Sequence, residues 1–377
     1  MVTVDDITAA LATVNDPEIN RPLTELGMVK AVAVGEDGAV RVDVWLTVSG
    51  CPLREEITSR VRSAVGRLAG VSAVEVVLDV MGDEQRRELA GRVRGGQEAD
   101  REIPFARPGS LTRVLAIASG KGGVGKSSVT VNLAAALAGR GLRVGVLDAD
   151  VYGFSVPRML GVTGRPTQVE NMIMPPQAGG VKVISIGMFT EGNSPVTWRG
   201  PMLHRALQQF LADVFWGDLD ALLLDLPPGT GDIAISLAQL LPGAELLIVT
   251  TPQVAASEVA ERAGSVAART HQRVVGVVEN MAWLSCPHCD ERIEPFGSGG
   301  GTAVAEALSR LLGHDVPLLG SVPLDPRLRE GGDAGRPLVV SDPDSVAGKE
   351  LRRVADAVMG RPRGLVGRPL PLSPRSA

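Results

Sequence analysis

The sequence predicts an α/β protein in which a doubly wound, mainly parallel sheet follows a small α+β domain. Three observations favour this fold class. From residue 113 onward, short apolar runs of strand length alternate with longer segments of helical periodicity. Aromatic residues make up only 3% of the 377 residues, so the core must use Val, Leu, Ile and Ala, as parallel sheets covered by helices do. A glycine-rich turn joins the first apolar run to a helical segment.

The N-terminal part of the chain is predicted to form the small α+β domain. Residues 4–14 have helical spacing, and residues 31–48 have the pattern of two strands joined by a Gly-Glu-Asp-Gly turn. An amphipathic helix over 53–68 and a third strand over 71–80 complete this domain. We therefore expect the first domain to span residues 1–81.

Two further segments are dense in charge, Gly or Pro and have little apolar periodicity. Residues 82–110 are predicted to be a charged linker with a short helix at its start. Residues 359–377 mix Pro, Gly and Arg and cannot bury much apolar surface, so we expect a disordered tail.

The second domain is predicted over residues 111–358. Its expected strands are 113–118, 143–147, 181–186, 221–225, 245–250, 274–278 and 316–321. Parallel strands linked by helices require right-handed crossovers, which produce a doubly wound sheet. Such sheets bind ligands at the carboxyl ends of their strands, so residues that directly follow a strand are the first candidates for a functional site.

Charge and cysteine content exclude several classes of protein. The chain has 38 basic and 43 acidic residues, which argues against a globally basic nucleic-acid-binding surface. No apolar run approaches the ~18–20 residues that span a bilayer, and the N-terminus lacks the pattern of a signal peptide. The 3 cysteines do not make a disulfide framework. We expect a soluble cytoplasmic protein with no nucleic-acid and no membrane partner.

A phosphate-binding loop is indicated by GKGGVGKS at residues 120–127. The segment matches G-x-x-x-x-G-K-[ST], with a predicted strand before it and a helix after it, as the motif requires. Its glycines let backbone N–H groups close around phosphate oxygens, and the helix N-terminus adds a favourable dipole. Lys126 is expected to reach the β- and γ-phosphates of ATP, and the Ser127 hydroxyl to hold Mg²⁺. The expected nucleotide-binding residues are Gly120, Lys121, Gly122, Gly123, Val124, Gly125, Lys126, Ser127 and Ser128.

Lys121 is unnecessary for an ordinary phosphate loop. The segment KGGVGKS resembles the deviant Walker A motif of the MinD/ParA/nitrogenase-iron-protein class. The resemblance implies a lysine that reaches across a two-fold axis to the nucleotide of the other subunit, and hence an ATP-sandwich homodimer. The alternative is that Lys121 is a solvated loop lysine.

Carboxylates follow two other predicted strands. Asp225 comes directly after an apolar run and suits the Mg²⁺-side carboxylate of a P-loop protein, and the Pro227–Gly229 loop behind it suits a γ-phosphate sensor. Asp150 suits a switch position that orients the attacking water. The alternative for both is capping or turn formation at a strand end, and for Asp148 the two readings are equally supported.

Cys286 and Cys289 form the sequence CPHC. Such a pair is compatible with half a zinc site, a redox dithiol or half an iron–sulfur site, and with two incidental surface cysteines. The segment after it has the pattern of a hairpin or irregular loop rather than the helix of a thioredoxin-like motif. If Lys121 implies a two-fold dimer, two such pairs could supply the four thiolates of a [4Fe–4S] cluster or of Zn²⁺. We expect His288 to be solvated.

Several longer segments together resemble the Mrp/ApbC family of iron–sulfur cluster carrier ATPases. They are SGKGGVGKSSVTVNLAAALA, LDADVYGFSVPRMLG, LLLDLPPGTGD, VENMAWLSCPHC and FGSGGG. The N-terminal DPEINRPLTELGMV and VSGCPLREEI are similar to the small iron–sulfur assembly domain that is often fused ahead of such ATPases. The resemblance therefore covers nearly all of the chain apart from linker and tail.

This resemblance implies roles for further residues. It implies ATP at residues 120–127, Mg²⁺ near Ser127 and a subunit-bridging [4Fe–4S] cluster on Cys286 and Cys289. Asn280 falls where related ATPases contact adenine, although a turn-forming Asn is nearly as well supported. Cys51 matches a cysteine at a helix start, where thiolate chemistry and a buried structural role are both open. Phe154 departs from the Pro that is common in the family after Tyr-Gly, without removing a catalytic group.

The leading hypothesis is an ATP-hydrolysing carrier that passes a [4Fe–4S] cluster to apo-proteins and works with cluster-assembly scaffold proteins. Its chemistry is phosphoryl transfer to water, with Lys121 and Lys126 stabilising charge and Asp150 orienting the nucleophile. Two alternatives are a partitioning or positioning ATPase of the MinD/ParA class and an ATP-dependent iron–sulfur reductase. The first leaves CPHC without a task, and the second needs a redox partner.

Overall fold

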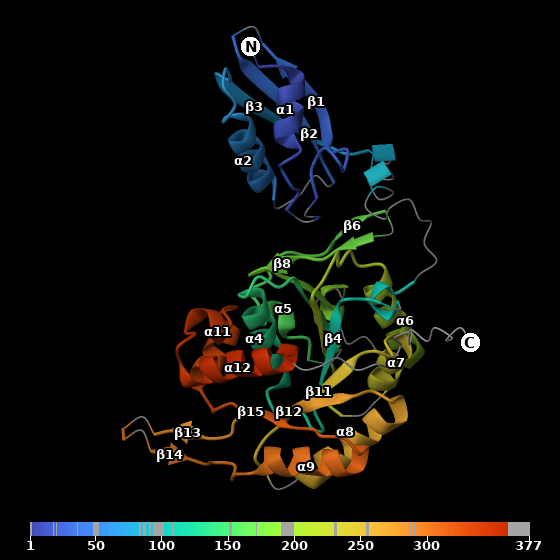
Figure 1. Cartoon of the computed structure of the whole chain (residues 1–377), viewed down its shortest axis with the longest axis vertical. Coiled ribbons are helices and arrows are strands. Elements are labelled where there is room, and N and C mark those ends of the chain that lie inside the picture. Colours follow the sequence, from blue (N-terminus) through green and yellow to red (C-terminus); the bar gives the residue numbers. More distant parts are fainter. Residues whose placement is uncertain are drawn as a thin grey trace, which may run out of the picture. The chain divides into compact units, whose positions relative to one another are not determined.

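The computed structural model divides into two compact units, which we describe separately (Figure 1). The first unit comprises Met1–Asp100, Pro166–Pro175 and Asp213–Gly217, and the second comprises Arg101–Arg165, Pro176–Ala212 and Asp218–Ala377. The structure describes residues 2–17, 19, 21–35, 37–47, 53–82, 84–85, 88–89, 92, 102–107, 109–150, 153–170, 172–189, 200–229, 232–253, 256–286, 288–289 and 291–360.

The first unit contains a three-stranded sheet covered by two helices. Its elements are α1 (Val4–Leu11), β1 (Val29–Val34), β2 (Ala39–Leu46), α2 (Arg54–Val65) and β3 (Ala73–Val80). β2 is central and pairs antiparallel with β1 and parallel with β3. Alternate residues of β2 are buried, as expected for a strand with one face on a core. These elements agree with the predicted α+β domain.

The beginning of the predicted linker packs on this first unit. Leu89 is only 1% exposed and belongs to the same hydrophobic core as α1 and α2. Arg92 follows three residues later, and its carbonyl oxygen accepts a hydrogen bond from the Arg21 guanidinium at 3.0 Å. The predicted division at residues 81, 110 and 358 stays a prediction.

A hairpin from the middle of the chain also belongs to the first unit. β6 (Thr167–Val169) and β7 (Met172–Met174) pair antiparallel. The backbone N–H of Ile173 donates a hydrogen bond to the Asp213 carbonyl oxygen, and the Ile173 carbonyl oxygen accepts one from the Phe215 N–H. Each strand is too short for a periodic pattern, which explains why the sequence did not predict it.

The second unit is built on an eight-stranded sheet. In spatial order its strands are β15 (Leu318–Ser321), β12 (Val274–Glu279), β11 (Glu245–Thr250), β4 (Arg113–Ala118), β10 (Ala221–Asp225), β5 (Val144–Asp148), β9 (Val181–Ser185) and β8 (Gln177–Ala178). All neighbouring strands pair parallel except β8, which pairs antiparallel with β9. The predicted fold class is therefore confirmed, and each predicted strand is present within two residues at either end.

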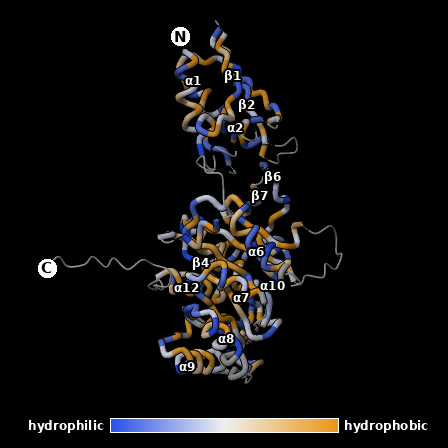
Figure 2. The backbone as a smooth tube through the Cα atoms, turned by 90° about the vertical axis from the view of Figure 1, so that its right-hand side faces the viewer, coloured by the Kyte–Doolittle hydropathy of each residue, from blue (hydrophilic) through white to orange (hydrophobic). Residues whose placement is uncertain are grey.

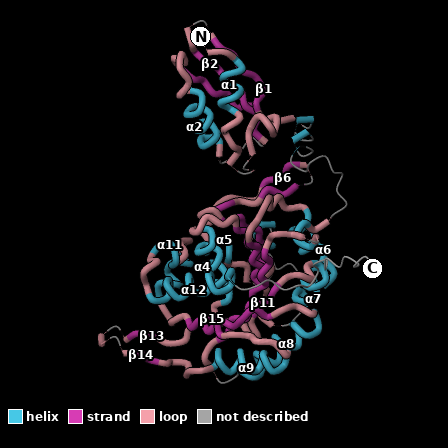
Figure 3. The backbone as a smooth tube through the Cα atoms, viewed as in Figure 1, coloured by secondary structure: helices cyan, strands magenta, loops and turns pink. Residues whose placement is uncertain are grey.

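Helices cover both faces of this sheet (Figures 1 and 3). One face carries α4 (Lys126–Ala138), α5 (Val156–Met159), α11 (Leu338–Ser341) and α12 (Val346–Gly360), and the other carries α6 (Gly200–Ala212), α7 (Asp232–Leu240), α8 (Ala256–Thr270) and α9 (Gly300–Leu312). The remaining helical segments are η1 (Pro104–Ala106), η2 (Ile186–Phe189) and α10 (Pro326–Asp333). None of the described helices is long and apolar enough to cross a membrane. α12 includes residues 359 and 360 of the predicted tail, and residues 361–377 lie outside the described residues.

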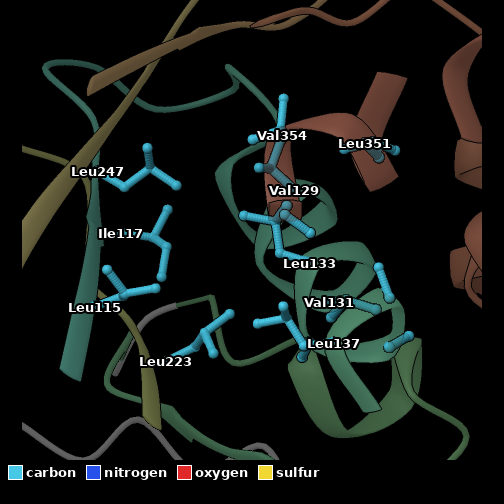
Figure 4. Close-up of a cluster of buried hydrophobic side chains, with 14 of the residues drawn as sticks. Leu115, Ile117, Val129, Val131, Leu133, Leu137, Leu223, Leu247, Leu351 and Val354 are labelled. Carbon is cyan, nitrogen blue, oxygen red and sulfur yellow. The ribbon is translucent and has the colours of Figure 1, made fainter. Parts of the chain in front are cut away.

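The core between the sheet and α4 fixes the start of α4 relative to β4. Figure 4 shows Leu115, Ile117, Leu223 and Leu247 of the sheet opposite Val129, Leu133 and Leu137 of α4, with Leu351 and Val354 of α12 beside them. The chain is predominantly hydrophobic around β4 (Figure 2). Burying one such side chain stabilises the fold by roughly 1.5–3 kcal/mol. The turn between β4 and α4 is therefore anchored at both ends.

Candidate functional site

The turn between β4 and α4 has the conformation of a phosphate-binding loop. Gly123 and Gly125 have φ angles of 79° and 78°, in the left-handed region that favours glycine. A Cβ atom built on Gly123 would meet no atom within 4 Å, so space is open beside the loop at that position. Gly125 directly precedes Lys126, the first residue of α4. The loop therefore offers an open backbone and a helix N-terminus together, which suits bound phosphate.

Asn280 braces this loop from the end of β12. Its Nδ2 donates a hydrogen bond of 2.9 Å to the carbonyl oxygen of Val124, and only 4% of Asn280 is exposed. A Cβ on Gly125 would lie 2.2 Å from this Nδ2, so the contact also requires glycine at 125. The adenine contact predicted for Asn280 stays a prediction, and the brace is a contact that the sequence did not reveal.

Lys126, Ser127 and Asp225 form one buried polar cluster. The Lys126 ammonium lies 2.7 Å from Asp225 Oδ1, and the Ser127 hydroxyl donates to Asp225 Oδ2 at 2.5 Å. Thr130, one turn further along α4, donates to Asp225 Oδ1 at 2.8 Å. Sequence reasoning missed Thr130, although its position four residues after Lys126 places both on one helix face. The predicted residues of the two strand ends thus lie in direct contact.

Asp148 lies beside this cluster and is fully buried. It occupies the same register position on β5 as Asp225 does on the neighbouring strand β10. Burial, together with the Asp225 carboxylate, raises the pKa of Asp148 to about 8. Asp148 accepts hydrogen bonds from the Ser185 hydroxyl and the Val156 amide, at 3.2 and 3.3 Å. Its observed contacts are those of a buried group that organises the loop after β5.

Asp150 makes a turn-forming contact in this structure. Its Oδ1 accepts a hydrogen bond from the Gly153 amide at 3.0 Å, and Asp150 is 9% exposed. The Pro227–Gly229 loop contacts the phosphate loop directly, because the Gly229 amide donates to the Ser119 carbonyl oxygen at 2.9 Å. The Pro227–Gly229 loop is therefore hydrogen-bonded to the residue that precedes the phosphate loop, whereas this contact of Asp150 lies within its own turn. The switch roles predicted for both segments stay predictions.

A cavity of about 340 Å³ adjoins the phosphate loop. Its lining surface is mostly apolar near Met159, Met281 and Leu328, and it also includes four charged residues, Arg158, Asp325, Arg329 and Asp333. An apolar slot beside a phosphate-binding backbone suits a ligand that combines a flat base with phosphates. The cavity therefore provides space for a base beside the phosphate loop.

Lys121 points to a different partner from Lys126. Its ammonium donates a hydrogen bond to Oε1 of Gln253, in the loop that follows β11. The neighbouring carbonyl oxygen of Gly120 accepts from Arg262 of α8 at 3.4 Å. Sequence reasoning missed both contacts, because the partners are separated by 132 residues in one contact and by 142 in the other, and such distant pairs give no local pattern.

The cysteine pair lies on a short hairpin after β12. β13 (Leu284–Ser285) and β14 (Arg292–Ile293) pair antiparallel, and the Cys286 amide continues the ladder by donating to the Glu291 carbonyl oxygen at 2.9 Å. This confirms the hairpin alternative for the segment. Cys286 is partly buried and Cys289 is exposed, and neither forms a disulfide with any residue that the structure describes.

The outgoing strand of this hairpin is held at its base by the segment that follows β15. The Ala282 amide donates to the Val322 carbonyl oxygen at 2.9 Å, and the Leu324 amide donates to the Trp283 carbonyl oxygen at 2.6 Å. The Arg292 guanidinium lies 5.0 Å from the centre of the Trp283 ring, within the range of a cation–π contact. The hairpin therefore leaves the sheet from a fixed base close to Asn280.

The returning end of the hairpin is anchored by glycines at the start of α9. The Gly301 amide donates to Glu279 Oε1 at 2.7 Å, and the other oxygen of this 6%-exposed carboxylate accepts from the Ser321 hydroxyl. A Cβ on Gly300 would lie 2.6 Å from the Pro252 carbonyl oxygen. The motif FGSGGG thus serves close packing, and Glu279 caps the helix, a role that sequence reasoning missed.

The oxygen ligands at the phosphate loop fit Mg²⁺, whereas the cysteine pair alone is incomplete for a metal. Ser127 Oγ and Asp225 present a hydroxyl and a carboxylate side by side, which are ligands that Mg²⁺ prefers. Among the residues that the structure describes, no three His, Cys, Asp or Glu side chains gather so that they could hold a metal ion. His288 is exposed, and Cys51 lies outside the described residues.

Comparison with known proteins gives the family of each part of the chain. The family model described as "NUBPL iron-transfer P-loop NTPase" matches residues 110–359, and that described as "Iron-sulfur cluster assembly protein" matches residues 4–76. The chain is 65% identical to an iron–sulfur cluster carrier protein of Mycobacterium tuberculosis, over 98% of this chain and 96% of that one. It is 42% identical to an iron–sulfur cluster carrier protein of Bacillus subtilis, over 86% and 89% of the two chains.

A solved structure supports the same assignment. The nucleotide-binding protein of Archaeoglobus fulgidus in complex with ADP is 35% identical, with a TM-score of 0.54, over 65% of this chain and 94% of that chain. Fold and loop define a P-loop NTPase. The chain belongs to the iron-transfer P-loop NTPase family of iron–sulfur cluster carrier proteins, with an N-terminal iron–sulfur cluster assembly domain. The predicted resemblance is confirmed.

Proposed function

We propose that this protein hydrolyses ATP and carries a [4Fe–4S] cluster between two copies of the chain for transfer to apo-proteins. Membership in the carrier family supports the cargo, and the phosphate loop supports the nucleotide. The observation that carries the proposal is the position of the cysteine pair. Cys286 lies six residues after Asn280, which is hydrogen-bonded to the phosphate loop.

Hydrolysis is assigned to side chains at the phosphate loop. Lys126 stabilises charge on the β- and γ-phosphates, for which it must share its ammonium with Asp225, its partner at 2.7 Å. Asp150 orients the attacking water, and turning toward that water requires it to leave the Gly153 amide. Asp148 is protonated near neutral pH, because its pKa is about 8, so it adds no second buried negative charge beside Asp225.

Ser127 and Asp225 are the residues that would hold Mg²⁺, directly or through water. When bound, Mg²⁺ neutralises charge that develops on the phosphate oxygens. Thr130 fixes the orientation of the Asp225 carboxylate through its hydrogen bond of 2.8 Å. The cavity lined by Met159, Met281 and Leu328 receives the base of ATP.

The cluster is assigned to Cys286 and Cys289 of two chains. One described chain presents two cysteines on this hairpin, while a cubane cluster takes four thiolates. A second copy supplies the other two thiolates. In the same proposed dimer, Lys121 of each copy reaches the nucleotide of the other, so that the two copies share the nucleotide sites. Recipient apo-proteins and assembly scaffold proteins are the proposed partners, and a cytoplasmic location stays a prediction.

Anaerobic reconstitution with iron and sulfide tests this function. The full-length chain is expected to gain the absorption and Mössbauer spectra of a [4Fe–4S] cluster, to become dimeric and to transfer the cluster to an apo-protein in an ATP-dependent manner. Uptake of zinc alone under these conditions would overturn the carrier function in favour of a structural metal site. Retention of the cluster during turnover, with electron delivery to a redox partner, would favour the reductase.

A further inference from the structure

Lys121, the first of the two lysines in the phosphate loop, is hydrogen-bonded within its own chain. The Lys121 ammonium donates a hydrogen bond to Gln253 Oε1. Gln253 follows β11, which is the direct neighbour of β4 in the sheet, and β4 leads into the phosphate loop. The two loops therefore emerge side by side at the carboxyl edge of the sheet, and the contact joins them.

The backbone that leads to Gln253 is held by contacts with two neighbouring segments. The backbone carbonyl oxygen of Thr250 accepts a hydrogen bond from the backbone N–H of Asn280 at 2.8 Å, and Thr251 is 5% exposed. Pro252 is packed against the start of α9 so closely that a Cβ on Gly300 would overlap its backbone. Gln253 itself is exposed, and its side-chain amide faces Lys121 directly after this held segment.

This contact competes with the role that the proposed function gives Lys121. A lysine that reaches the nucleotide of a second copy cannot keep its hydrogen bond to Gln253. The Lys121 ammonium is a charged donor in both contacts, but a phosphate oxygen carries negative charge where the Gln253 amide oxygen is neutral, so attraction between opposite charges is added to the hydrogen bond. Lys121 therefore exchanges the neutral Gln253 amide for phosphate when a second copy presents its nucleotide. Without that nucleotide, Lys121 keeps its hydrogen bond to Gln253.

We propose that Gln253 is a positioning residue for Lys121, which it holds against its own chain until the nucleotide of a second copy replaces it. The inference rests on the proposed shared-site dimer and adds the group that sets how readily the dimer forms. Gln253 opposes association, because its hydrogen bond to Lys121 is broken when the two copies combine.

Two substitutions of Gln253 have opposite expected effects. Gln253→Ala removes the acceptor and leaves Lys121 ready to reach across, so half-maximal ATPase activity per chain requires about fivefold less protein. Gln253→Glu offers Lys121 a charged acceptor, so half-maximal activity requires about fivefold more protein. A merely structural role for Gln253 would move both variants in the same direction.

The experiment measures ATP hydrolysis per chain for the full-length protein over a dilution series, at saturating ATP and Mg²⁺. Gln209, an exposed glutamine on α6, provides matched controls as Gln209→Ala and Gln209→Glu, which should follow the wild type. Opposite shifts of the two Gln253 variants support the inference. Shifts in one direction, or none, overturn it.

The same series separates this inference from the proposed function. If wild-type activity per chain rises with protein concentration but the Gln253 variants do not diverge, only the role of Gln253 fails. If wild-type activity per chain is independent of concentration and Lys121→Ala matches it, the shared site fails, and the role of Gln253 fails with it.

Discussion

Asp148 and Asp225 occupy paired register positions at the ends of the neighbouring parallel strands β5 and β10, and both are fully buried. Asp225 is paired with Lys126 and Ser127, whereas Asp148 accepts hydrogen bonds from Ser185 and from backbone amides. Two carboxylates this close do not both ionise readily in a buried site. Burial, together with the neighbouring Asp225 carboxylate, thus raises the pKa of Asp148 to about 8.

This arrangement predicts a pH-dependent stability. The Asp148 carboxyl has a pKa of 3.8 when unperturbed and about 8 in the fold. Between these pH values the folded chain therefore keeps a proton on Asp148 that the unfolded chain has lost. Its stabilising contribution is complete below the lower pKa and falls as pH rises toward 8, by up to about 1.4 kcal/mol per pH unit. Asp148→Asn keeps a neutral side chain of the same shape and lacks this proton.

Chemical denaturation of wild type and Asp148→Asn at pH 5.5, 6.5 and 7.5 checks this prediction. The free energy of unfolding of the variant should improve relative to the wild type with each step upward in pH. Parallel pH profiles of the two proteins would contradict a raised pKa at Asp148.

Lys126→Ala should abolish ATP hydrolysis. The substitution removes the ammonium that faces Asp225 and the phosphates, and loss of one such preorganised contact costs ~3–4 kcal/mol of transition-state stabilisation, about 10²–10³ in rate. Steady-state hydrolysis is measured beside Lys349→Ala, a control that removes an exposed lysine from α12. Turnover near the wild-type level in Lys126→Ala would sink the assignment of the phosphate loop.

Asn280→Ala should weaken nucleotide binding about tenfold, because the buried Val124 carbonyl oxygen loses its donor. Asn280→Asp should weaken it further, since a carboxylate oxygen would then face that carbonyl oxygen. Titration with ATP and GTP separates the brace from a base contact. Loss of the brace weakens both nucleotides equally, while loss of an adenine contact weakens ATP selectively.

The iron content of the reconstituted protein should be about two atoms per chain, because two chains share the four irons of one cluster. Cys286→Ala or Cys289→Ala should lose stable cluster and transfer, yet still bind ATP. Cys51→Ala should keep the cluster and at most slow its delivery. Four irons per monomer, or a cluster that persists when both Cys286 and Cys289 are replaced, is incompatible with the bridging arrangement.

The sheet and the phosphate loop could be predicted because their signals are local. An apolar strand, a glycine-rich turn and a helix follow one another within residues 113–138, and each later strand is a short apolar run. The approach of Asp225 to Lys126 was predictable in outline, since parallel strands end at one edge. The contact of Lys121 with Gln253 was not, because it depends on loop conformations after two strands. The β6–β7 hairpin was missed because it is stabilised by pairing with residues 213–215 rather than by its own pattern.

The two-stranded hairpin that bears Cys286 and Cys289 has a consequence for how cargo leaves the protein. Under the proposed function, each chain is a bidentate ligand, and neither chain alone satisfies the cluster. Separation of the copies strips the cluster of two thiolates in one event, rather than one at a time. A recipient that offers a pair of cysteines replaces the departing chain in kind, so the carrier should favour recipients whose cysteines are already held close together.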